Sequence, residues 1–144
     1  MDQRQRNDLE GRRVSQFGRA PIYVVIDGFL RWIPNPTTMN ALFRDWSHDE
    51  MDLTDIIGYD ELKPDGPCPL PLPDSTALVK AAGRPEVYLL DFNNLRANPP
   101  DGRIVKRHIM SPTAMDRYNL SWDKISEISP VAIDAIPEGI PMTG

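Results

Sequence analysis

The sequence predicts an α+β fold in which two copies of one unit, a β-hairpin followed by a short helix, pack into a single pseudo-two-fold domain. Three observations support this prediction. Similar stretches recur along the 144 residues in the same order, which is typical of a duplicated unit. An Asp-Gly pair lies between two apolar runs and indicates a tight hairpin. An Asn-Pro step and a Ser-Pro step lie at matching places in the two copies, and each is typical of a helix start.

The recurring stretches form three blocks. They align residues 22–27 with 87–91, residues 31–39 with 107–115 and residues 64–67 with 137–140, at spacings of 65, 76 and 73. Trp46 matches Trp122 at the second of these spacings. The spacing changes because the second copy has about 11 extra residues within 93–104, and the first copy has about three within 47–63. Both stretches are polar and rich in turn residues, where insertions are tolerated.

Each copy begins with a predicted hairpin. In the first copy the strands are residues 22–26 and 29–33, and Asp27-Gly28 is the turn, because a type I′ turn needs a positive φ at both central residues. In the second copy the strands are residues 87–90 and 104–109. The insertion at 93–104 contains prolines and an Asp-Gly pair and is expected to form a long loop.

A short helix and a return segment are predicted after each hairpin. Asn35 and Ser111 are the expected N-caps, and the proline after each of them begins a helix, over 36–43 and 112–118. The other expected elements are return segments at 53–57 and 125–128, single helical turns at 60–62 and 133–136, and a short helix at 77–82.

The predicted boundaries are a disordered tail at 1–19, a first repeat at 20–70, a linker at 71–84 and a second repeat at 85–144. Because a two-stranded hairpin is marginally stable alone, the repeats are expected to share one core. The tail is basic, but acidic residues interrupt it, so we interpret it as a solvated segment rather than a nucleic-acid arm. Its basic residues are Arg4, Arg6, Arg12, Arg13 and Arg19, and the acidic ones are Asp2, Asp8 and Glu10.

Composition excludes several classes of protein. A net charge of −5 and a pI of about 4.9 argue against a phosphate-binding surface, so no nucleic-acid partner is expected. No apolar stretch is long enough to span a membrane. No signal peptide precedes the first repeat, which predicts a cytoplasmic protein by default. The single cysteine, Cys68, lies between two prolines and is interpreted as a turn residue.

The stretch Arg31-Trp32-Ile33-Pro34-Asn35-Pro36-Thr37-Thr38-Met39, the tryptophan beyond it and the closing Ile136-Pro137-Glu138-Gly139-Ile140-Pro141 resemble a tandem repeat of bacterial proteins. That repeat reads Arg-Trp-Ile-Pro-x-Pro-x-Thr, then Trp, then Ile-Pro-x-Gly, and it has no established biochemical activity. The resemblance covers about 120 residues and implies a surface or interaction accessory. The second copy departs from the pattern, with His108 at the aromatic position, and both copies have Met where Phe is commoner.

The matching positions give two sets of candidate residues. Met39 and Met115 are expected to face inward, and Trp46 and Trp122 are expected to be buried anchors, with an exposed sugar-stacking surface as the alternative. The candidate binding residues are Arg31, Trp32, Arg107 and His108. The arginines are expected either to pair with Asp27 and Asp91 across their own hairpins or to line a ligand site. His108 matches Trp32 and is expected to pack on the hairpin surface.

No catalytic, metal or cofactor motif emerges from the sequence. The acidic segment 48–55 lacks the spacing and central glycine of a calcium loop and is interpreted as a solvated segment, with a weak cation site as the alternative. We therefore predict a non-enzymatic binding or adaptor module that recognises a protein partner. A module for surface glycans is the first alternative. A small hydrolase or lyase that uses His48 or His108 is the second.

Overall fold

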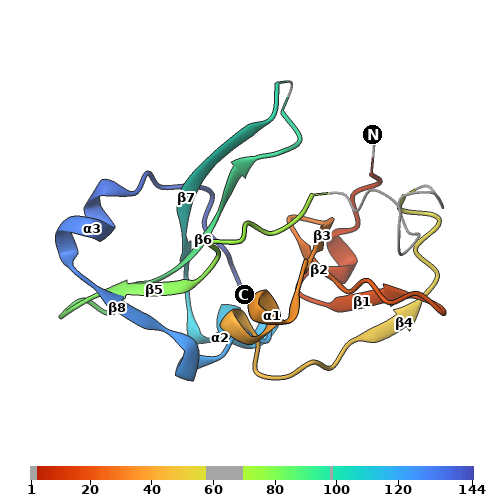
Figure 1. The fold of residues 1–144 in the computed structure, drawn as a ribbon, viewed down its shortest axis with the longest axis horizontal. Coiled ribbons are helices and arrows are strands. Elements are labelled where there is room, and N and C mark those ends of the chain that lie inside the picture. Colours follow the sequence, from red (N-terminus) through yellow and green to blue (C-terminus); the bar gives the residue numbers. More distant parts are fainter. Residues whose placement is uncertain (1–2, 58–69, 98) are drawn as a thin grey trace.

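A computed structural model describes residues 3–57, 70–97 and 99–144 of this chain. The fold is α+β, with two four-stranded mixed sheets and a few short helices arranged as two similar units (Figure 1). The helical turn expected at 60–62, Cys68 and the block at 64–67 lie outside the described residues.

The first unit contains one four-stranded sheet. Its elements are η1 (Asn7–Leu9), β1 (Arg13–Gln16), β2 (Tyr23–Ile26), β3 (Phe29–Trp32), α1 (Pro36–Leu42) and β4 (Asp49–Met51). The strand order is β3-β2-β1-β4. The neighbours of β1 differ in direction, because β2 is antiparallel to it and β4 is parallel.

The second unit has the same strand order and the same directions. Its elements are β5 (Leu78–Ala81), β6 (Val87–Asn94), β7 (Asp101–Ile109), α2 (Pro112–Arg117), η3 (Trp122–Lys124), β8 (Ser126–Ile128) and α3 (Pro130–Ala135). The order is β7-β6-β5-β8, with β5 and β8 parallel. The hairpin registers also correspond, since Tyr23 lies opposite Trp32 and Tyr88 lies opposite His108.

The local signals for the turn and the helix starts are confirmed. Asp27 and Gly28 have φ values of 57° and 80° and form the predicted turn. The Oδ1 atom of Asn35 accepts a hydrogen bond of 2.8 Å from the backbone N–H of Thr38. Ser111 Oγ accepts one of 3.2 Å from the backbone N–H of Ala114. Each cap therefore satisfies one of the free N–H groups of its helix.

The structure differs from the sequence prediction at one inner strand of each sheet. Residues 1–19 were expected to form a disordered tail, but β1 lies there and buries Val14 completely. Residues 77–82 were expected to form a helix in the linker, but β5 lies there instead. Alanine, leucine and lysine favour helix weakly, and pairing with two neighbouring strands overrides that preference. Each strand is short and is recognisable only through its partners.

Two smaller differences follow from strand pairing. The return strand β4 ends before the predicted segment at 53–57. The insertion at 93–104 lengthens the β6–β7 hairpin rather than forming only a loop, with a register irregularity between Phe92 and Asn94. The long hairpin projects beyond its own sheet in Figure 1. Backbone pairing there satisfies N–H and C=O groups that a loop would leave to solvent.

One core cluster draws buried side chains from both units. It combines residues of β2, α1, β6 and α2 with the chain around Tyr118 and Leu120. Just after the two helices, the backbones of Phe43 and Leu120 pair in an isolated antiparallel β-bridge. Helices α1 and α2 lie together between the sheets in Figure 1. Smaller clusters lie on the outer face of each sheet. A substantial part of the apolar burial in each unit therefore lies in a core that it shares with the other.

Tyr118 provides a prediction for alkaline pH. Burial, together with a hydrogen bond to the Glu10 carboxylate and its negative charge, raises the pKa of the Tyr118 hydroxyl above its usual value. A raised pKa in the folded state adds stability below the unfolded pKa of about 10, and that stability is lost as the pH rises further. We expect the free energy of unfolding to fall above about pH 10 and to fall less in Tyr118→Phe. Denaturant melts at a series of alkaline pH values check this. An equal fall of the free energy of unfolding with pH in the two proteins would contradict it.

Candidate functional site

Two surface grooves are the candidate functional sites. The first groove is lined by residues 20–22 and 32–36 together with Met39 and Trp46, and has a volume of about 250 Å³. The second groove is lined by residues 85–87 and 108–112 together with Met115 and Trp122, and has a volume of about 300 Å³. The lining residues correspond one to one, at the spacings of 65 and 76 found in the sequence. Each unit therefore has a groove at the corresponding position.

The two grooves are built from the same elements. One wall comes from the chain that leads into the middle strand, β2 or β6, and the other from the end of the edge strand, β3 or β7, and the helix start after it. Met39 and Met115 are buried, at 2% and 1% exposed, and lie where the groove meets the core. Proline at helix position N1 fixes the backbone on this wall. The groove shape is thus set by rigid segments.

The expectation that Trp46 and Trp122 are buried anchors is wrong. Their side chains are 46% and 49% exposed. Each follows the end of its helix, and the core space there is filled by Leu42 and Phe43 in the first unit and by Leu120 in the second. The indole N–H of Trp46 donates a hydrogen bond of 2.9 Å to the Asn40 side chain, so the ring is held in place while remaining exposed.

The grooves differ at the positions that carry polar groups. Trp32 lines the first groove where His108 lines the second, and Pro21 corresponds to Glu86. The His108 ring lies 5.4 Å from the ring of Tyr88, its strand neighbour, which agrees with a hairpin-surface position. The first groove has walls of apolar side chains except at Asn35, whereas the second contains Glu86, His108 and Ser111.

Arg31 and Arg107 do not line the grooves, because their guanidinium groups reach Asp91 between the two units instead. Arg31 donates hydrogen bonds of 2.8 and 2.6 Å to the two carboxylate oxygens of Asp91, in the other unit. Arg107 bonds Asp91 at 3.2 Å in its own hairpin and Asp27 at 2.8 Å in the other unit. The expected pairing within each hairpin is therefore found only for Arg107. Together these hydrogen bonds form a network that joins the two units.

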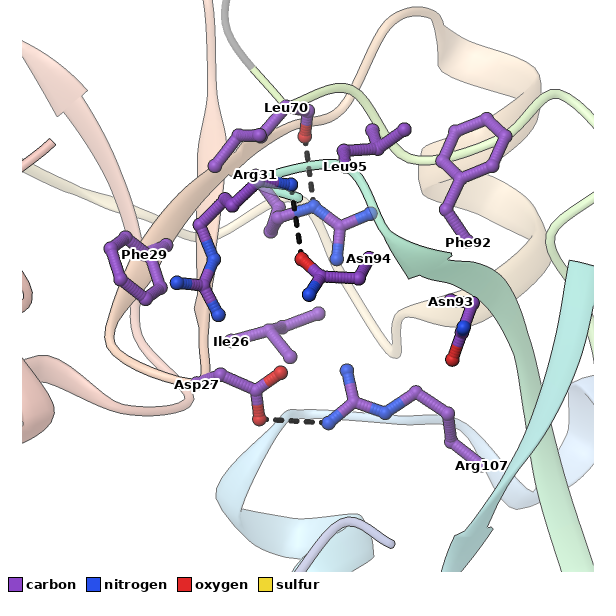
Figure 2. Close-up of a pocket in the computed structure, with 11 residues that line it drawn as sticks. Ile26, Asp27, Phe29, Arg31, Leu70, Phe92, Asn93, Asn94, Leu95 and Arg107 are labelled. Atoms are coloured by element: carbon purple, nitrogen blue, oxygen red, sulfur yellow. Dashed lines mark hydrogen bonds and ion pairs between the residues drawn. The ribbon is translucent and has the colours of Figure 1, made fainter. Parts of the chain in front are cut away.

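Every guanidinium nitrogen of this Arg–Asp network has a hydrogen-bond partner. Each side-chain nitrogen of Arg31 and of Arg107 donates a hydrogen bond, in part to the carbonyl oxygens of Leu70 and Ile140. Burial lowers the pKa of Arg107, but the adjacent Asp27 and Asp91 carboxylates outweigh it and raise that pKa. The bonded side chains of Asp27 and Arg107 form part of the lining of a small cavity of about 40 Å³ (Figure 2). Since its polar groups are paired, we interpret the network as a structural link.

The acidic segment 48–55 has its carboxylates directed to separate partners. Asp49 pairs with Arg12 at 2.7 Å, and Asp55 pairs with Arg6 at 3.0 Å. Asp52 accepts hydrogen bonds from the backbone and side chain of Thr54, which lower its pKa. Across residues 3–57, 70–97 and 99–144, no group of three or more His, Cys, Asp or Glu side chains is placed to hold a metal ion.

No family model matches the chain, and neither the curated proteins nor the solved structures contain a match. Within the described part of the chain, no helix is both long and apolar enough to cross a membrane. The positions of Trp32, His108 and both helix starts were predicted from the sequence. The groove walls formed by residues 20–22 and 85–87, which lead into β2 and β6, were not. The signal was present in the alignment, because Pro21 and Glu86 directly precede the first matched block.

Proposed function

We propose that this protein is a non-enzymatic binding or adaptor module whose two grooves each hold a short apolar segment of a protein partner. The observation that carries the proposal is the pair of corresponding grooves, each with a half-exposed tryptophan beside a buried methionine. Tryptophan is enriched among the residues that dominate binding energy at protein interfaces. An exposed indole held at the rim of an apolar groove is suited to close over an inserted side chain.

The polarity of the walls favours a peptide over a sugar. Sugar recognition needs donors and acceptors beside the aromatic ring, and the side chains of Asn35 and Ser111 are already used as helix caps. The first groove otherwise offers apolar side chains, among them Ile22, Ile33 and Met39. Burying apolar surface there contributes roughly 25 cal/mol per Å² before the costs of association.

The proposal includes an approximate two-fold relation between two copies of one repeat, of the tandem bacterial kind that the sequence resembles. Hydrogen bonds between the helix ends support it, because Arg44 N–H donates to the Asn119 carbonyl at 3.0 Å and Ser121 N–H donates to the Leu42 carbonyl at 2.9 Å. Such antiparallel pairing of matching segments is what a two-fold axis between them produces. Two sites on one rigid body bind a partner with two segments more tightly through effective concentration.

The test is loss of binding when the tryptophans are truncated. Peptides are selected from a random library on the wild-type protein, and their affinity is measured for Trp46→Ala, Trp122→Ala and the double variant. Truncation at an interface hot spot costs about 2 kcal/mol or more, so each change should weaken its peptides by at least tenfold. The exposed Phe17, outside both grooves, is the control, as Phe17→Ala should leave binding unchanged. Selected peptides that bind all variants equally would contradict the proposal.

A second candidate, a small histidine-dependent hydrolase or lyase, is favoured by one observation. His108 and Glu86 line the same groove, so an imidazole and a carboxylate face one space. General acid–base catalysis needs such a pair within reach of a substrate. The test is a screen of candidate substrates with the wild-type protein and His108→Ala. Turnover of a substrate by the wild-type protein but not by His108→Ala would support the enzyme hypothesis and replace the adaptor proposal.

A further inference from the structure

We propose that the second groove selects a partner segment with a basic side chain next to its apolar residue, whereas the first groove takes a purely apolar segment. This inference rests on the proposed function and assigns a ligand chemistry to one of its two sites. It follows from the single acidic residue on the groove walls, Glu86, which stands where the first groove has Pro21.

Glu86 carries an unpaired carboxylate oxygen. Its Oε2 atom is buried and has no hydrogen-bond partner in the described part of the chain, while the side chain as a whole is half-buried. The negative charge of Glu86 helps to raise the pKa of the nearby Arg84. The guanidinium of Arg84, however, donates its hydrogen bonds to Asp134, at 2.8 and 3.3 Å. A partly desolvated carboxylate without a partner is unfavourable until a cation or donor reaches it.

The surroundings of Glu86 suit a lysine or arginine side chain. The groove beside it is lined by Val87, Met110 and Met115, which can pack against the aliphatic stem of such a residue. His108 adds a ring nitrogen at the position of Trp32 and reduces the apolar area there. The net charge of −5 on the whole chain also attracts a basic segment at long range.

The inference is tested with random-library peptides selected on the wild-type protein and depleted on Trp122→Ala, which leaves peptides specific to the second groove. We expect these peptides to share a lysine or arginine and to bind Glu86→Gln about tenfold more weakly. Replacing the basic residue of the peptide with glutamine should cost a similar factor on wild type and little on Glu86→Gln. Peptides specific to the first groove, depleted on Trp46→Ala, should bind Glu86→Gln as they bind wild type.

The outcomes separate this inference from the proposed function. Peptides that depend on Trp122 but lack a shared basic residue, or that bind Glu86→Gln unchanged, overturn the charge selection and leave the grooves as binding sites. Failure to recover any peptide that depends on either tryptophan overturns both. The double variant Pro21→Glu, Trp32→His gives the first groove the glutamate and the histidine of the second, and a new preference for basic peptides there would support the inference independently.

Discussion

Asp91→Asn is expected to lower the free energy of unfolding by about 3–5 kcal/mol, the usual cost of removing one partner from a buried ion pair. The Asp91 carboxylate is completely buried and accepts hydrogen bonds from Arg31 and Arg107. Its neutralisation leaves two buried guanidinium groups with only Asp27 as a charged partner. Because the network joins the units, the loss should destabilise both together. Urea melts of the variant and wild type measure the difference.

Asp134→Asn is the matched control for Asp91→Asn. Asp134 also pairs with an arginine, Arg84, at 2.8 Å, but both side chains are largely exposed. Solvent screens such pairs, so this substitution should change stability little. If Asp91→Asn shifted the urea midpoint no more than Asp134→Asn does, the buried network would not be the link between the units.

Met39→Ala and Met115→Ala are expected to destabilise the protein by similar amounts, about 2–5 kcal/mol each, as is typical of large-to-small changes in a core. Both side chains are buried in the cluster that spans the two units. Since that cluster is shared, each variant should still unfold in a single transition. Circular dichroism and tryptophan fluorescence should therefore give coincident melts for both variants.

The tryptophan variants are the comparison for the methionine variants. Trp46→Ala and Trp122→Ala should destabilise the protein much less, because about half of each side chain is already exposed. Two separate unfolding transitions in Met115→Ala would contradict the assignment of core and groove residues. So would a loss of stability in Trp46→Ala as large as that in Met39→Ala.

The parts of the fold that the sequence predicts are those governed by local chemistry. The Asp27-Gly28 turn follows from φ preferences, and the helix starts at Asn35 and Ser111 follow from capping. The strands β1 and β5 were missed, because a four-residue strand is stabilised by its neighbours rather than by its own residues.

The candidate site was predicted only in part, for a reason that concerns long-range packing. Spacing identifies Trp46 and Trp122 as equivalent, but not whether they are buried, which depends on which residues fill the core beyond each helix. In the same way, sequence alternation separates Arg31 from Trp32 across the strand, yet it cannot show that Arg31 reaches Asp91 in the other unit. Both features depend on how the two units pack.

The most direct test of the account is the response of the indole N–H signals in proton–nitrogen NMR spectra as a library-selected peptide is added. The chain has three tryptophans, so each signal can be assigned by single substitution with phenylalanine. We expect peptides for the first groove to shift the signals of Trp46 and Trp32, which line it, and peptides for the second groove to shift the signal of Trp122, each to saturation. A peptide that binds while both the Trp46 and Trp122 signals stay in place would contradict the claim that the grooves are the binding sites.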